Sequence, residues 1–344
     1  MSNTIIISIT TLLLSFVISL VLGFIHIRFM RSKHIGQIIN TDVPSSHHIK
    51  NGTPTCGGLF FITGITITTL LTQQLQSRFI LLPLVTMWLF ASIGFIDDLA
   101  KIVKKESIGL RTSRKLAMQI LASALVLYLY VNYFSSEAMI VAHPFDPSKA
   151  LQVKLWYPLL FLLYMVGFVN AVNISDGLDG LVVTSILAPL ALLALIALLV
   201  SSHVFSFALL PSIVRNSRAT LILLCATIGS LLAFWWYNGP KASVFMGDTG
   251  SHALGSLFAI IALQLKVEFV MIIASSVFMI EALSSLIQII SRRLFNKKVF
   301  LIAPLHHHYE QKGVSESRIV NRFHIISILS TLIALVVFLI SNRI

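Results

Sequence analysis

Charged residues are scarce in this chain. Of its 344 residues, 11% are Asp, Glu, Lys or Arg and 56% are hydrophobic, whereas roughly 25% of a soluble globular protein is charged. The mean hydropathy of the sequence is +0.90. This composition excludes an ordinary water-soluble domain and predicts an integral membrane protein.

Cysteines and linkers are also few. Cys56 and Cys225 are the two cysteines. One stands at a predicted cytoplasmic helix start and the other inside an apolar run, so we expect free thiols rather than a disulfide. No long Pro, Gly or Ser linker and no low-complexity tract interrupts the sequence. We therefore expect a single polytopic membrane domain that comprises residues 1–344.

Long apolar runs occupy most of the sequence instead. A helix needs about 20 mainly apolar residues to cross a bilayer, and such runs predict an all-α fold with about ten transmembrane helices. The ten predicted spans lie near residues 4–27, 57–75, 79–96, 116–134, 155–173, 181–203, 219–237, 250–264, 268–291 and 322–341.

The basic residues predict the orientation of these spans. Arg28, Arg31 and Lys33 follow the first span and are assigned to the cytoplasm, so ten spans place both termini outside. In this topology the cytoplasmic segments hold 18 of the 25 Lys and Arg. Orientation thus accounts for most of the net charge of +12, and we do not expect nucleic acid as a partner.

Nine of the thirteen acidic residues fall on the same cytoplasmic side, although Asp and Glu contribute little to orientation. Five of the nine lie at span ends in three motifs: FIDDLAK (95–101), NAVNISDGLDGL (170–181) and VFMGDTGS (244–251). Converging carboxylates repel one another unless a positive charge offsets them. Mg²⁺ suits such a site, because it takes few carboxylates and completes its shell with water and substrate phosphate.

Each motif alone also has a plainer interpretation. FIDDLAK can be a helix end with an Asp98–Lys101 ion pair, although the helix dipole disfavours acids there. NAVNISDGLDGL can be a turn, yet its polar residues at 170, 173, 176 and 179 recur every three positions. The glycines of VFMGDTGS would let backbone amides approach an anion. Together the motifs favour a metal and phosphate site at one membrane face.

Basic segments border this predicted site. Lys101 and Lys115 flank the loop between the third and fourth spans, where an ammonium can meet a phosphate at the bilayer surface. The other cations of the loop need no role beyond orientation. The segment HIKNGTPTCGG (48–58) is either a loop that approaches phosphate or a helix start.

Two further features lie near the C-terminal end. His306, His307 and His308 precede Glu310, in a run that can bind metal, donate hydrogen bonds to a substrate or form a solvated loop. Residues 292–302 interleave basic and apolar side chains, as in a helix that lies in the membrane interface.

The ninth predicted span carries an unusual polar face, formed by Glu281, Ser284, Ser285 and Gln288. Such a face either makes hydrogen bonds between helices or lines a polar cavity in a broken helix. An intramembrane acid also fits an ion-coupled transporter. Transporter sites usually lie at the bilayer midplane, whereas the acids of this sequence gather at one face.

The motifs resemble those of the polyprenyl-phosphate N-acetylhexosamine-1-phosphate transferases. DDLAK (97–101), NAVNISDGLDGL, VFMGDTGS and APLHHHYE (303–310) match this family in order and approximate spacing, from about residue 28 to residue 324. PLHHHYE is typical of its muramoyl-pentapeptide branch. The resemblance implies ten spans with periplasmic termini, a bacterial inner-membrane location, an active site that faces the cytoplasm and a requirement for Mg²⁺.

The resemblance also implies a reaction. Undecaprenyl phosphate attacks the β-phosphate of UDP-N-acetylmuramoyl-pentapeptide, which releases UMP and forms lipid I, the first membrane-bound intermediate of peptidoglycan synthesis. A homodimer is compatible with this function. An N-acetylglucosamine-1-phosphate transferase for another cell-wall polymer is the alternative, and the histidine segment argues against it.

Residue roles carry over by motif position. Asp248 resembles the magnesium ligand, and Asp97 and Asp98 resemble a pair near the lipid phosphate, of which one is proposed to deprotonate it. The other matched positions are Asn173, Asp176 and Asp179 around the nucleotide and metal, Lys50, Thr55, Asn238, Phe245 and Gln288 along the nucleoside and sugar pocket, and His307 and His308, with the adjoining His306, near the donor.

The chemistry of phosphoryl transfer fits these roles, because it depends on positioning and charge neutralisation, which Mg²⁺, Lys101 and Lys115 can provide. A phosphate monoester has its second pKa near about 6, so a base is less needed. Direct attack and a phospho-enzyme on an Asp both remain open. The sequence departs from the family at Cys56, His252 and Ser256, where Met, Leu and Gly are usual.

Overall fold

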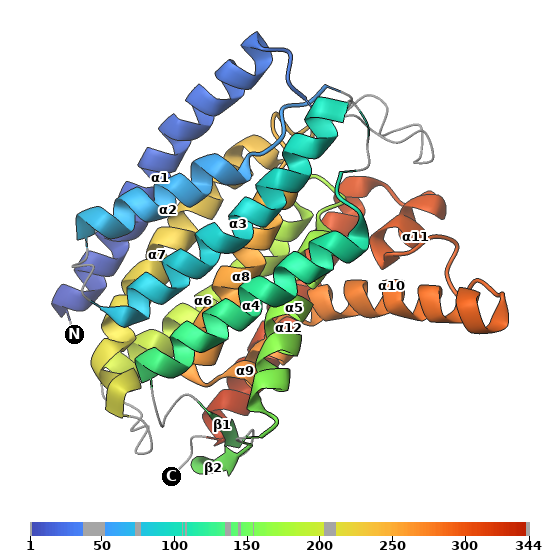
Figure 1. Cartoon of the computed structure of the whole chain (residues 1–344). Coiled ribbons are helices and arrows are strands. Elements are labelled where there is room, and N and C mark those ends of the chain that lie inside the picture. Colours follow the sequence, from blue (N-terminus) through green and yellow to red (C-terminus); the bar gives the residue numbers. More distant parts are fainter. Residues whose placement is uncertain are drawn as a thin grey trace.

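Long apolar helices make up most of the chain in the computed structural model (Figure 1), which describes residues 2–36, 52–72, 77–104, 106, 109–134, 139–143, 146–153, 155–202 and 211–341. The helices are α1 (Ser2–Ser32), α2 (Gly58–Thr72), α3 (Arg78–Lys104), α4 (Thr112–Phe134), α5 (Tyr157–Ser175), α6 (Leu181–Ser201), α7 (Pro211–Asn238), α8 (Gly247–Leu265), α9 (Glu268–Ala274), α10 (Ser276–Phe295), α11 (Leu305–Gln311) and α12 (Glu316–Ser341). The expected helical, multi-pass membrane protein is confirmed.

Seven of the described helices are long and apolar enough to span a membrane, or eight if α9 and α10 form one span. The second and eighth of the ten predicted spans are not among them. Helix α2 has 15 residues, and α8 opens with the polar sequence GDTGSH. Helix α8 nevertheless suits the interior of a bundle, because all its residues from Thr249 to Leu265 are buried by other helices.

The predicted ninth span, 268–291, is not one straight helix. It breaks at Ser275 into α9 and α10, whose axes differ by 79°, and α10 projects sideways from the bundle (Figure 1). The bend follows from the packing of the two parts. Helix α9 packs against α12, whereas α10 packs mainly against α5.

The fold also contains a small departure from an all-α architecture. Strands β1 (Ile140–His143) and β2 (Asp146–Gln152) form an antiparallel hairpin with an irregular register at Ala142 and His143. The apolar runs did not predict it, because the hairpin lies between two predicted spans and β2, with the sequence DPSKALQ, has neither an apolar run nor β-branched residues. The hairpin lies at the end of the bundle where α1 begins and α12 ends, and α3 ends at the opposite end (Figure 1).

Three helices bring the acidic motifs to that opposite end. Helix α8 packs against α3 on one side and α5 on the other. FIDDLAK lies in the last turns of α3, NAVNISDGLDGL closes α5, and VFMGDTGS opens α8. The convergence expected from the sequence therefore rests on a single central helix and its two neighbours.

Candidate active site

Asp98 joins the end of α3 to the beginning of α8. Its Oδ1 accepts a hydrogen bond from the backbone amide of Asp248 at 3.0 Å. Its Oδ2 accepts the amide and hydroxyl of Thr249 at 3.0 and 2.7 Å. Met246, at the N-cap of α8, provides no side-chain cap. A carboxylate from another helix therefore caps α8, in the position that the helix dipole favours for an anion.

Two glycines permit this close contact between α3 and α8. Gly247 has a positive φ of 73°, and a Cβ there would lie 2.5 Å from Asp98 Oδ2. A Cβ at Gly94 would lie 2.1 Å from the backbone oxygen of Asp248. Larger residues at either position would separate the two helices and, with them, the carboxylates.

The segment before α2 pairs with the segment before α8. Phe245 donates its amide to Pro54 and accepts the amide of Gly57, at 2.8 and 2.9 Å. Thr55 is buried and accepts a hydrogen bond from His26 Nε2 through its backbone oxygen, at 3.0 Å. The predicted pocket residues Thr55 and Phe245 thus lie in one paired loop beside the start of α8. Lys50, predicted to line the same pocket, lies outside the described residues.

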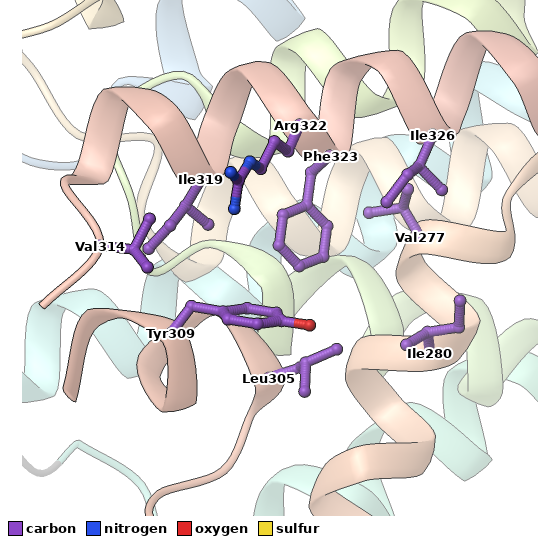
Figure 2. Close-up of a pocket in the computed structure, with 9 residues that line it drawn as sticks. All are labelled: Val277, Ile280, Leu305, Tyr309, Val314, Ile319, Arg322, Phe323 and Ile326. Carbon is purple, nitrogen blue, oxygen red and sulfur yellow. The ribbon is translucent and has the colours of Figure 1, made fainter. Parts of the chain in front are cut away.

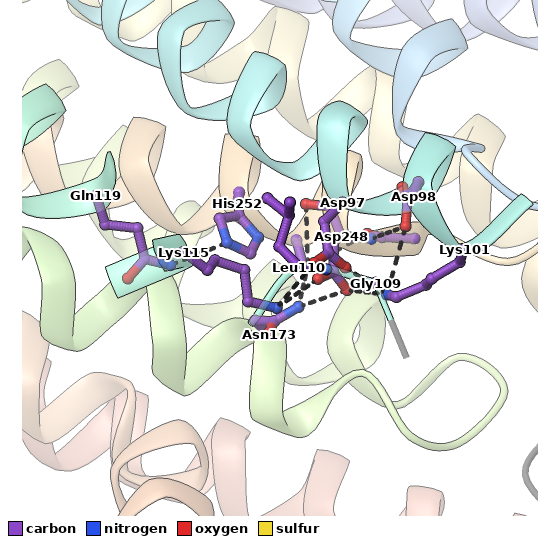
Figure 3. A network of polar contacts seen from close by, with 12 residues as sticks. Asp97, Asp98, Lys101, Gly109, Leu110, Lys115, Gln119, Asn173, Asp248 and His252 are labelled. Atoms are coloured by element: carbon purple, nitrogen blue, oxygen red, sulfur yellow. Dashed lines mark hydrogen bonds and ion pairs between the residues drawn. The ribbon is translucent and has the colours of Figure 1, made fainter. Parts of the chain in front are cut away.

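Asp248 is surrounded by positive and polar groups from three helices (Figure 3). Lys115 Nζ of α4 lies 2.7 Å from Asp248 Oδ2, and Lys101 Nζ of α3 lies 3.2 Å from Oδ1. Asn173 Nδ2 of α5 donates to Oδ1 at 3.1 Å. The side chains of Asp248 and Lys115 are 14% and 19% exposed, so solutes can reach both.

Asp97 belongs to the same cluster. Its Oδ2 lies 2.7 Å from Lys101 Nζ, and its Oδ1 accepts the backbone amide of Leu110 at 2.8 Å. Lys115 Nζ lies 3.9 Å from Oδ1. The structure therefore brings together all five residues that the sequence predicted as catalytic: Asp97, Asp98, Lys101, Lys115 and Asp248.

A second polar layer lies one helical turn deeper. The sequence had drawn attention to Asn170 and His252, but not to Gln119 or to a contact among the three. Gln119 follows Lys115 by four positions, Asn170 precedes Asn173 by three, and His252 follows Asp248 by four. Asn170 Nδ2 donates to Gln119 Oε1 at 2.7 Å. Gln119 Nε2 lies 2.9 Å from His252 Nε2. The helical spacing from each motif residue was the signal that could have found this layer.

Asp176 and Asp179 have different surroundings. Burial and the negative charges of Asp248 and Asp98 raise the pKa of Asp176 to about 8, so a cation nearby would favour its ionised form. Asp179 Oδ2 accepts the backbone amide of Ala242 at 3.1 Å. Asn238 accepts the amide of Gly180 at 3.0 Å and donates to Val244. Asp179 and Asn238 thus fasten the DGLDG loop to the chain that follows α7.

Only one of the three consecutive histidines is fully buried. His306 Nδ1 lies 2.9 Å from Glu281 Oε2, and its backbone amide donates to Oε1 at 3.1 Å. A Cβ at Gly177 would lie 2.3 Å from His306 Nε2. His306 therefore anchors α11 between α10 and the DGLDG loop, and the polar face of the ninth span serves this contact.

The other two histidines remain partly open. His307 Nδ1 lies 2.6 Å from Glu310 Oε2, and His308 Nδ1 accepts the amide of Leu301 at 3.1 Å. Gln288 binds the backbone of Val299 and Phe300 through both ends of its amide, at 2.9 to 3.0 Å. Gln288 thus shapes the loop that leads to the histidines.

The donor set suits a hard divalent cation. Carboxylate oxygens of Asp97, Asp98 and Asp248 lie within 4.8 Å of one another. Both oxygens of Asp98 accept hydrogen bonds from α8, whereas Asp248 and Oδ2 of Asp97 contact side chains, which can move. Two ammonium groups against three carboxylates leave a net negative charge, and oxygen ligands of this kind are those that Mg²⁺ takes.

The two cysteines are free, as predicted, and both are buried. Burial and the nearby Asp98 carboxylate raise the pKa of the Cys56 thiol. The raised pKa favours the thiol form of Cys56, which is a weaker nucleophile than the thiolate.

Comparison with known sequences agrees with this arrangement. The family model described as "Glycosyl transferase family 4" matches residues 80–266, more than half of the chain. The chain belongs to glycosyl transferase family 4. The matched residues of this family extend from α3 to the end of α8 and contain all three acidic motifs.

Relatives named phospho-N-acetylmuramoyl-pentapeptide-transferase are similar over nearly the whole chain. The protein from Francisella philomiragia is 36% identical over 337 residues, which cover 96% of this chain and 91% of that protein. Its counterpart from Endomicrobium trichonymphae is 39% identical, over 94% and 90% of the two chains. That from Rickettsia akari is 36% identical, over 92% and 89%. The resemblance inferred from the motifs is confirmed at the level of the family.

Proposed function

We propose that this protein transfers phospho-N-acetylmuramoyl-pentapeptide from UDP-N-acetylmuramoyl-pentapeptide to undecaprenyl phosphate, with release of UMP and formation of lipid I for peptidoglycan synthesis. The observation that carries the proposal is Asp248, held by Lys101, Lys115 and Asn173 from three helices. Relatives that bear this activity in their names align over at least 89% of their length.

The proposed roles follow from the contacts. Asp248 and Asp97, with Asp176 nearby, would hold Mg²⁺, which when bound would neutralise charge on the phosphates. Lys101 and Lys115 would exchange carboxylate partners for phosphate oxygens and orient them for in-line attack. An oxygen of undecaprenyl phosphate forms a bond to the β-phosphorus as the bond from that phosphorus to the UMP oxygen breaks.

Asp97 has little need to remove a proton from the acceptor. A phosphate monoester is largely dianionic at neutral pH, because its second pKa is about 6. Lys101 Nζ lies 2.7 Å from Asp97 Oδ2 and competes with a proton for this oxygen. We therefore assign Asp97 to holding cations and shaping the electrostatic field around the attacking oxygen.

The pocket roles are also proposals. Thr55, Phe245, Asn238 and Gln288 would build the walls for nucleoside and sugar, with Lys50 beside them. His307 and His308 are partly exposed and would meet the donor. His306 and Asp179 would position the loops that carry these groups, and Asn173 would orient Asp248.

The membrane arrangement extends the same proposal. One domain of ten spans in a bacterial inner membrane would place both termini outside and the carboxylates at the cytoplasmic face. The predicted cytoplasmic segments hold 18 of the 25 basic residues, and the start of α1 and the end of α12 lie opposite the end of α3 (Figure 1). A homodimer would be compatible with this arrangement.

A donor assay tests the proposal. Purified protein receives radiolabelled UDP-N-acetylmuramoyl-pentapeptide or UDP-N-acetylglucosamine, each with undecaprenyl phosphate and with or without Mg²⁺. We expect UMP and a lipid-linked product only from the muramoyl donor with Mg²⁺. Product only from UDP-N-acetylglucosamine would overturn the substrate assignment, and equal turnover after complete chelation would overturn the metal requirement.

A further inference from the structure

A separate cavity of about 160 Å³ lies between α10, α11 and α12 (Figure 2). Its walls are mainly apolar. Val277 and Ile280 come from α10, Tyr309 comes from α11, and Ile319, Phe323 and Ile326 come from α12. None of these side chains belongs to the carboxylate cluster.

The cavity opens toward the lipid-facing surface of the protein. Ile280 and Ile326, on opposite walls, are 42% and 43% exposed. Both belong to helices whose outward apolar side chains would contact acyl chains in a membrane. Hydrocarbon can therefore enter the cavity directly from the bilayer.

One charged side chain lines this apolar space. Arg322, in the second turn of α12, is exposed and faces α11 beside Phe323 (Figure 2). No carboxylate among the described residues lies within ion-pair distance of Arg322. The phenol of Tyr309 offers a second hydrogen-bond donor on the facing wall. A cation and a hydroxyl at the mouth of an apolar cavity match a phosphate attached to a hydrocarbon chain.

We propose that this cavity binds an anionic phospholipid of the surrounding membrane. One acyl chain occupies the apolar part, and the lipid phosphate pairs with Arg322. Basic pockets between transmembrane helices on the cytoplasmic side bind anionic lipid headgroups in this way.

The inner wall of the cavity indicates a bound lipid rather than the reacting substrate. Val277, Ile319 and Phe323 share one buried cluster with Leu178 and Leu181. This cluster closes the cavity on the side of the DGLDG loop. Helix α12 packs against α6, α9, α10 and α11, whereas the carboxylates come from α3 and α8. A phosphate at Arg322 is therefore separated by packed side chains from the site of transfer.

The same cluster connects the lipid to the loop. Leu178 lies between Gly177 and Asp179 in the DGLDG sequence and packs against cavity-lining side chains. An acyl chain in the cavity packs against these side chains on the side away from the DGLDG loop. Because a ligand that binds only the folded state stabilises it, bound lipid raises the melting temperature.

Lipid retention measured by native mass spectrometry tests this site. Purified protein is mixed with phosphatidylglycerol or with phosphatidylcholine, and the retained lipids are counted. Arg322→Gln is expected to lower phosphatidylglycerol retention about fivefold, because one cation near an anionic membrane surface contributes roughly 1 kcal/mol to binding. The matched control is Arg318→Gln, one turn earlier on α12, because Arg318 is exposed but does not line the cavity. It is expected to behave like the unaltered protein.

A second variant tests the acyl chain. Ile326→Trp fills the mouth of the cavity at a side chain that is 43% exposed, so the helix can accept it, and it is expected to reduce retention of both lipids. Unchanged retention in this variant or in Arg322→Gln would overturn the site. Equal losses in Arg322→Gln and Arg318→Gln would assign binding to general surface charge. Displacement of phosphatidylglycerol by an equimolar amount of undecaprenyl phosphate would make the cavity a substrate channel and overturn the proposal.

Discussion

Asp98 fixes the position of Asp248 by accepting its backbone amide at 3.0 Å across 150 positions of sequence. The two acids of FIDDLAK consequently have different roles, one structural and one in the proposed site. Asp98 completes the first turn of α8, while Asp97 contacts Lys101 in the proposed reaction site. Substitutions can separate these roles, because stability and turnover respond differently.

Asp98→Ala is expected to destabilise the protein by about 3 kcal/mol, since it leaves buried amide groups of α8 without an acceptor. The measurement is thermal unfolding in detergent. Asp98→Asn retains one acceptor oxygen and should recover part of the loss. A melting temperature unchanged by Asp98→Ala would show that water or another group caps α8 equally well.

Asp248→Asn is expected to lower UMP release by at least about 100-fold, because a neutral amide oxygen binds Mg²⁺ much more weakly than a carboxylate does. The fold should remain, since the side chain keeps its shape and its backbone amide still binds Asp98. Activity and melting temperature are measured on the same preparation. Near-normal turnover with a normal melting temperature would remove Asp248 from the metal site.

Lys115→Gln is expected to lower kcat/KM by about 100-fold, as does the loss of one preorganised donor in other active sites. Lys115→Arg should recover only part of this activity, because a planar guanidinium does not reproduce a point charge. Lys104→Gln is the matched control, since Lys104 lies in the same basic segment and donates to Gly109 rather than to a carboxylate. Equal losses in the two Gln variants would indicate a general effect of charge.

Low pH is expected to destabilise the protein through protonation of His306, which anchors α11. Burial lowers the pKa of His306 from 6.5, although Glu281 opposes the shift. The unfolded chain then binds more protons than the folded protein as pH falls below about 6.5, so the free energy of unfolding decreases there and is fully retained above it. His306→Asn should flatten this decline in melting temperature between pH 7.5 and 5.5. An identical slope in both proteins would assign the pH response to other groups.

The sequence predicted much of the site because its signals were local. FIDDLAK, NAVNISDGLDGL and VFMGDTGS each combine span ends with acids, and membrane topology brings span ends to one face. The same reasoning predicted a roughly correct set of helices, because apolar length reports membrane crossing directly. It gave no warning of the bend between α9 and α10, which is set by tertiary packing.

Other roles depend on contacts between distant segments. Nothing near Asp98 in the sequence indicates that it caps α8. The N-cap residue of α8 is Met246, whose side chain cannot accept the free amides of the first turn, and this residue is far from Asp98 in the sequence. Asn238 and Gln288 match pocket positions by motif, yet both ends of each amide bind backbone groups in the structure. Gln119 is one of many residues in an apolar run until α4, α5 and α8 are packed together.

The distance in sequence between α3 and α8 has a consequence for biogenesis. Synthesis of the intervening 150 residues takes roughly 8 to 30 s, during which α3 is present without α8. Lys101 belongs to the same helix as both acids and lies 2.7 Å from Asp97 and 3.7 Å from Asp98. The nascent helix therefore carries its own counterion, and the lysine can protect the unfinished site from charge repulsion before it meets any phosphate.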